Sequence, residues 1–130
     1  MCDITNKIQL AKQSIILIDD FVDESTITIL SKKSPEVSVK IISRNRLMTH
    51  ERNVKRRKIF RGGFSFYETN LFKNRYLLVD EKFLFLMSRP LRFNSKRNFY
   101  FVRIIDKEQV MNMNKRIEEC QMAKKTSRHF

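Results

Sequence analysis

The chain has 130 residues, which is close to the commonest size of one domain and too short for two domains that each bury a core. Apolar residues make up 42% of it and charged residues 32%, a balance that excludes wholesale disorder. Lys and Arg number 27 against 14 for Asp and Glu, and the resulting net charge of +13 favours polyanionic partners.

Neither the cysteines nor the apolar runs indicate export. Cys2 and Cys120 lie near opposite ends without CxxC spacing or a histidine cluster, so they predict neither a metal site nor a redox pair. The first apolar run, 14–18, is too short for a signal peptide, and no run approaches the roughly 20 residues of a membrane-spanning helix. We therefore expect a cytoplasmic protein with reduced thiols, no membrane span and no cofactor.

The first third of the chain predicts a helix and then a strand–helix–strand unit. Apolar residues at helical spacing indicate a helix over 4–13, and the β-branched run 15–18 indicates a buried strand. Asp23 or Ser25 is suited to cap a second helix, which Ser34-Pro35 would end. A strand over 37–43 follows, so the two strands should pair in parallel through the helix between them.

The remaining elements are a basic helix, several short strands and a terminal helix. The basic segment 44–61 is closed by Gly62-Gly63. The predicted strands are 64–67, 76–79, 83–87 and 99–105, with a tight turn over 80–82, and the predicted helix covers 107–124. The sequence has no internal repeat, so we expect a single α/β domain over residues 1–130.

The order of these elements, together with the stretch 11–23, resembles the phospholipase D-like superfamily. In that family an early strand ends in a phrase such as I-D-x-Y-I/V-D, which is matched here by Ile18, Asp19, Phe21, Val22 and Asp23. The resemblance covers most of the chain. It implies a mixed sheet flanked by helices.

The family signature H-x-K-x4-D, followed by a G-S pair, falls in altered form on the third quarter of the chain. Arg75 stands for the motif lysine, Asp80 matches the aspartate, and Met87-Ser88 stands for the G-S pair. Lys73 replaces the histidine that attacks phosphorus in the family, and a protonated ammonium has no lone pair for that step. The resemblance therefore implies the fold without the usual chemistry, with Asp80 pairing with Arg75 or Lys73.

Two basic segments are candidates for phosphate contact. Within 44–61, eight cations meet one acid, Glu51, whereas an ordinary solvated helix face mixes both signs. The loop 89–98 contains no acid, and its Phe93 is suited either to stack on an unpaired base or to fold into the core. The residues that we expect to bind nucleic acid are Arg52, Lys55, Arg56, Arg57, Lys73, Arg75, Arg89, Arg92, Lys96 and Arg97.

Three acids follow the first predicted strand: Asp19, Asp20 and Asp23. Clustered carboxylates can hold Mg²⁺, but no second acidic strand accompanies them. We therefore favour helix capping and pairing with nearby cations, and predict no metal site.

The sequence predicts a catalytically degenerate domain that binds DNA or RNA through a basic groove. The alternative is a metal-independent phosphodiesterase or nuclease in which His50 is supplied across a dimer interface as the nucleophile. Because the family brings two signatures together and this chain has one, the resemblance also implies a homodimer. We expect its interface to be formed by apolar residues of 83–87 and 99–105. Adsorption to an anionic membrane is disfavoured because the sequence lacks an amphipathic helix with large exposed apolar residues.

Overall fold

The computed structural model describes residues 3–43, 63–123 and 128–129 of the chain. The basic segment predicted over 44–61 lies outside these residues. The helices and strands are, in chain order, α1 (Ile4–Leu10), β1 (Ser14–Ile18), α2 (Glu24–Leu30), β2 (Ser38–Ser43), β3 (Phe64–Glu68), β4 (Arg75–Val79), β5 (Phe83–Met87), the 3-10 helix η2 (Leu91–Phe93), β6 (Phe101–Ile104), α4 (Lys107–Ala123) and β7 (Arg128–His129).

The described strands form one mixed sheet in the order β6-β5-β4-β1-β2-β3-β7. β1 pairs in parallel with β2, and β2 in parallel with β3, whereas the other pairings are antiparallel. The parallel strand–helix–strand unit and the hairpin between β4 and β5 are therefore confirmed.

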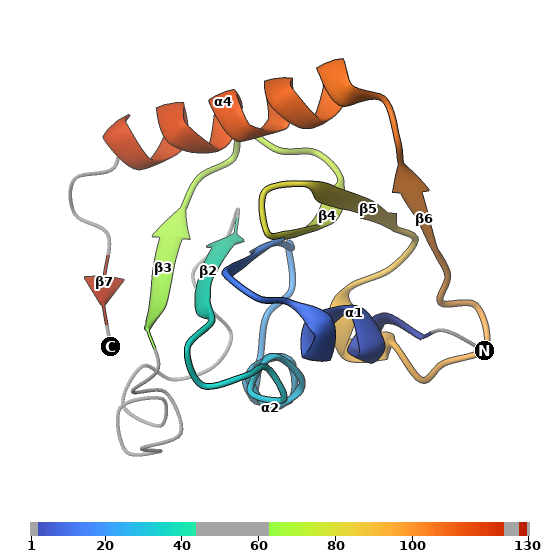
Figure 1. The fold of residues 1–130 in the computed structure, drawn as a ribbon. Coiled ribbons are helices and arrows are strands. Elements are labelled where there is room, and N and C mark those ends of the chain that lie inside the picture. The colour runs from blue at the N-terminus through green and yellow to red at the C-terminus, as the bar shows by residue number, and fades with distance from the viewer. Residues whose placement is uncertain (1–2, 44–62, 124–127, 130) are drawn as a thin grey trace.

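Helices cover both faces of this sheet. Figure 1 shows α4 along one side of the strands and α1 and α2 along the other. In β1, Ile15 and Leu17 belong to the apolar cluster on the α1 and α2 side, and Ile16 and Ile18 belong to the cluster on the α4 side. A central strand that is buried on both faces is apolar without interruption, which explains the run of isoleucine and leucine.

Three predicted boundaries were wrong by a few residues. α2 ends at Leu30, whereas the sequence placed its end at Ser34-Pro35. α1 ends at Leu10 rather than at residue 13, because Ala11 is extended and the next three backbone N–H groups turn toward the Asp80 carboxylate. The last long strand covers 101–104 rather than 99–105.

The apolar residues expected at a dimer interface are divided between core and surface. Leu84, Phe85 and Met87 are at most 4% exposed and pack inside the chain's own core, so they are unavailable to a partner. The exposed apolar side chains of the two segments are Phe83, Tyr100, Val102 and Ile105.

The topology brings the ends of several strands to one edge of the sheet. The parallel strands β1, β2 and β3 end there, and β4 starts there because it runs antiparallel to β1. β5 also ends at this edge, and the loop that follows it, 88–100, returns to β6. We call this the carboxyl edge. It collects the signature residues other than Asp80.

Candidate functional site

A small cleft lies at the carboxyl edge, between the end of β1 and the start of β4. Its polar lining consists of Asp19 and Asp20 after β1, Thr69 after β3, and Lys73 and Asn74 before β4. Its apolar lining is Ile18, Ile42 and Phe72. Two carboxylates and an ammonium therefore surround one cleft, at the place where the sequence analysis put the start of the altered signature.

Asp19 is the buried acid of this site, with only 2% of its surface exposed. Its carboxylate accepts hydrogen bonds from the backbone N–H of Phe21 (3.0 Å) and of Leu91 (2.9 Å). Burial raises the pKa of Asp19 to about 6, and these two N–H donors and Arg75 oppose the rise only in part. Because Leu91 begins η2, Asp19 anchors the loop 88–100 to the end of β1.

Asp20 and Arg75 form a two-point ion pair beside Asp19. Arg75 Nε lies 2.7 Å from Asp20 Oδ1, and Nη2 lies 3.2 Å from Oδ2. About a third of each side chain is exposed, so the pair faces solvent at the rim of the cleft. Arg75 stands at the predicted motif position, but a phosphate group there would have to compete with this carboxylate.

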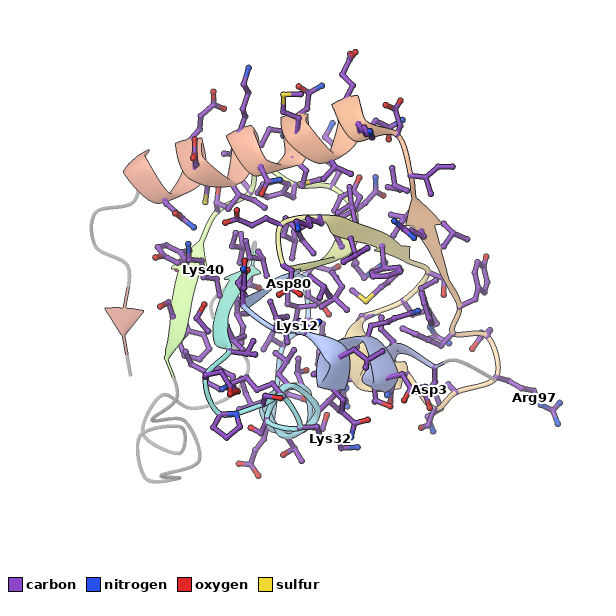
Figure 2. The ribbon with its side chains drawn as sticks, viewed as in Figure 1. Asp3, Lys12, Lys32, Lys40, Asp80 and Arg97 are labelled. Carbon is purple, nitrogen blue, oxygen red and sulfur yellow. The ribbon has the colours of Figure 1, made fainter. Side chains whose placement is uncertain are left out.

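The expectation that Asp80 pairs with Arg75 or Lys73 was wrong. Asp80 follows the last residue of β4, whereas Arg75 is its first, so the two lie at opposite ends of the strand. Its carboxylate accepts from the backbone N–H groups of Lys12, Gln13 and Ser14 at 2.7 to 3.1 Å. In Figure 2 Asp80 lies beside Lys12, far from Arg97. This acid stabilises the start of β1 rather than the candidate site.

The basic loop is ordered by stacking between its cations and aromatic rings. The Arg92 guanidinium lies 4.5 Å from the ring centroid of Phe21 and 4.9 Å from that of Phe93, and 3.2 Å from Asp23 Oδ2. Arg89 also lies 4.9 Å from the Phe93 centroid, and it donates to Asn98 Oδ1 at 2.7 Å. Phe93 is half-buried against two guanidinium groups and belongs to neither core cluster, so the prediction that it folds into the core was wrong, and base stacking stays a prediction.

The two residues at the expected G-S pair serve packing and loop closure. Met87 is 3% exposed and belongs to the core cluster on the α1 and α2 side. The Ser88 hydroxyl donates to the backbone oxygen of Asn98 (3.3 Å) and accepts from the backbone N–H of Tyr100 (2.9 Å). Ser88 therefore closes the loop 88–100 at its base.

Among the described residues, two segments place exposed cations near this edge. Lys73 is exposed beside the cleft, and Lys96 and Arg97 are exposed on the loop. In Figure 2 the side chain of Arg97 points away from the body of the protein. The predicted ligands Arg52, Lys55, Arg56 and Arg57 lie outside the described residues, as does His50.

The acids after β1 are used for capping and pairing. Asp23 caps α2 by accepting from the Thr26 N–H, and the Thr26 hydroxyl accepts from the Asp23 N–H, which completes a capping box. The predicted cap is confirmed. Within the ranges that the structure describes, no group of three or more His, Cys, Asp or Glu is placed to hold a metal ion. In those same ranges no helix is long and apolar enough to cross a membrane.

Comparison with solved structures identifies the fold, although the sequence matches no protein family and no curated protein. NucT from Helicobacter pylori superposes with a TM-score of 0.62 at 12% identity, over 91% of this chain and 84% of that chain. Nuc from Salmonella typhimurium, a phospholipase D family member, superposes with a TM-score of 0.60 at 16% identity, over 98% and 88%. This chain therefore has a phospholipase D-like fold, as the sequence predicted.

A third structure with a similar fold is TrmBL2, an archaeal chromatin protein described as having a novel mode of DNA binding. It superposes with a TM-score of 0.51 at 19% identity, over 89% of this chain and 46% of that chain.

Proposed function

We propose that this chain binds nucleic acid at the carboxyl edge, mainly through phosphate contacts, and that it does not hydrolyse phosphodiesters. The observation that carries the proposal is the exposed ammonium of Lys73 at the cleft, where the family signature has its nucleophilic histidine. An ammonium attracts a phosphate oxygen as a point charge but does not attack phosphorus.

The basic loop adds further charge to the same edge. Arg89, Lys96 and Arg97 lie on the segment that Asp19 anchors beside the cleft. Contacts of this kind position a nucleic-acid backbone without reading its sequence. The proposal is also supported by the DNA-binding description of TrmBL2, which has a similar fold.

Binding can be tested by fluorescence anisotropy with labelled single-stranded and double-stranded DNA and RNA. If about six phosphates are neutralised, affinity should fall on the order of 10³-fold between about 50 and 200 mM salt. Replacing Lys96 and Arg97 together by Ala removes two cations. The slope of log affinity against log salt concentration should therefore become shallower by about two. Replacing Lys12 and Lys32, two exposed lysines of the α1 and α2 segments, is the charge-matched control. A slope near zero would contradict electrostatic binding.

Incubation of the same nucleic acids with EDTA present tests for hydrolysis. We expect no cleavage. Metal-independent cleavage that His50→Ala abolishes would establish the nuclease alternative instead.

The proposed assembly is a homodimer that places two carboxyl edges in one groove. Its apolar contacts would come from the exposed side chains Phe83, Tyr100, Val102 and Ile105. Two copies at +13 repel each other, so we expect salt or a bound polyanion to tighten the dimer. Light scattering after size exclusion decides this, because a species of 15.7 kDa at micromolar concentration and moderate salt would rule the dimer out.

A further inference from the structure

A second cleft lies on the α4 side of the sheet, between the helix and the strands β4 to β6. Its floor is apolar, formed by Leu84 and Ile104. Its polar lining is Tyr76 from β4 and Gln109, Asn112 and Arg116 from α4. Its volume is about 180 Å³, below the roughly 300–1,000 Å³ of sites for drug-sized ligands, so one planar ring system is the size it suits.

The chemistry of this lining suits a heterocycle with donors and acceptors on its edge. Gln109, Asn112 and Arg116 are spaced three and four residues apart, so they line one flank of α4 and face the cleft together. Each amide offers both a donor and an acceptor, and the guanidinium adds donors only. Aromatic and guanidinium planes beside amide groups are the features by which proteins hold unpaired bases.

The second cleft adjoins the first. The Arg116 guanidinium lies 4.5 Å from the ring centroid of Phe72, which lines the first cleft, and donates to the Leu71 backbone oxygen at 2.7 Å. Tyr76 is the register partner of Ile18, which also lines the first cleft. The Phe72–Arg116 stack and the Ile18–Tyr76 pair thus separate the two clefts. The first cleft thus offers a cation for a phosphate group, and the adjoining cleft offers amide groups and an aromatic ring for a base.

We propose that the second cleft binds one unpaired nucleobase of a strand whose phosphates contact the carboxyl edge. This inference rests on the proposed function and specifies its ligand as single-stranded nucleic acid, since the bases of a duplex are stacked and paired inside it. The structure thereby assigns Gln109 and Asn112, which phosphate binding alone leaves without a role, to contacts with a base.

The test compares a single strand with its abasic counterpart of equal length and charge. We expect anisotropy titrations to show at least about fivefold tighter binding of the base-bearing strand, as one ordered base warrants. Replacing Gln109 and Asn112 together by Ala should remove most of this preference and leave affinity for the abasic strand unchanged. Both side chains are exposed, so the variant should fold. Gln9→Ala on α1, an exposed amide on the opposite layer, is the matched control.

A second variant, Tyr76→Leu, keeps apolar volume at a half-buried position and should also reduce the preference. Equal binding of the two strands would overturn the base cleft while phosphate binding stands. A preference that neither variant changes would place the base elsewhere and overturn the assignment. If neither strand binds, the proposed function fails, and the base cleft fails with it.

Discussion

Asp20 and Arg75 are 55 positions apart in the chain and meet through two hydrogen bonds at the rim of the first cleft. The Asp20 carboxylate pairs with the Arg75 guanidinium, which we expected to contact phosphate. Arg92, on the loop 88–100, forms a single-contact ion pair with Asp23, with Nη1 3.2 Å from Oδ2. The cationic edge is therefore partly neutralised by its own acids in the free protein.

Replacing Asp20 by Asn should strengthen nucleic-acid binding, because it frees the Arg75 guanidinium for a phosphate. The pair is about one-third exposed, so we expect a gain of about two- to fivefold in affinity at low salt. Glu36→Gln makes the same change in net charge at an exposed position outside both clefts and is the control. If both variants gain equally, the effect is one of net charge and not of the released arginine.

The buried Asp19 predicts a pH-dependent effect of its substitution on stability. Its pKa is about 6 in the folded chain against 3.8 without the fold, so the folded state holds this proton more tightly. Its contribution to stability is most favourable below pH 3.8 and declines as the pH rises through 6. In Asp19→Asn the side chain stays neutral. The free energy of unfolding of this variant, relative to the unsubstituted protein, should therefore rise by on the order of 3 kcal/mol between about pH 4 and pH 7.

Urea unfolding at a series of pH values measures this difference. Asn offers one side-chain acceptor fewer to the backbone N–H groups of Phe21 and Leu91, and this loss lowers the free energy of unfolding by the same amount at every pH. It therefore does not affect the trend with pH that is compared. Asp106→Asn, at an exposed position, should show no such rise. If the difference in the free energy of unfolding between Asp19→Asn and the unsubstituted protein does not change with pH, burial does not raise the pKa of Asp19.

Replacing Asp80 by Asn should destabilise the fold at neutral pH by about 1–3 kcal/mol, because charge-assisted hydrogen bonds to three backbone N–H groups become neutral ones. Partial burial acts to raise the pKa of Asp80, but the Gln13, Ser14 and Lys12 N–H donors outweigh it and the pKa is lowered. The loss should therefore shrink as the pH falls below 3.8. Asn tolerates the positive φ of 55° at this position.

Thermal unfolding compares this variant with Glu81→Gln, the same change in charge at the next residue, which also has a positive φ. Equal losses in the two would mean that the carboxylate of Asp80 has no special role.

Lys73→His alone should not create an active phosphodiesterase. The family chemistry requires a small residue before Ser88, and here Met87 is packed in the core. Arg75 is held by Asp20, and the Ser88 hydroxyl is occupied by Asn98 and Tyr100. We expect turnover of a phosphodiester reporter to stay at background with EDTA present. Rapid turnover would show that the rest of the pocket is competent.

The fold was predictable where short-range patterns decide it. The apolar run 15–18, the capping position of Asp23 and the apolar spacing along 107–123 are local signals, and each produced the element expected. The phospholipase D-like resemblance supplied the overall arrangement, which a motif comparison can recognise even when overall identity is low.

The pairings at the site were not predictable in the same way. That Arg75 does not meet Asp80 follows from the predicted strand between them, but its pairing with Asp20 depends on which strand lies beside β4, and the motif does not reveal this. The bond from Leu91 to Asp19 spans 72 positions. A signal was nevertheless present, because acids at the end of β1 must lie beside cations at the start of an antiparallel neighbour.

The position of β1 between β2 and β4 also constrains the order of assembly during synthesis. Its parallel partner β2 follows after a single helix, α2. Its antiparallel partner β4 ends only at Val79, and the next residue, Asp80, holds the start of β1 through hydrogen bonds. As the chain leaves the ribosome, the strand–helix–strand unit can close early, with one side of β1 still unpaired. The apolar strand β1 thus stays unpaired on one side until a partner strand about 60 residues later is synthesised. A chain truncated before Val79 would expose that edge to aggregation.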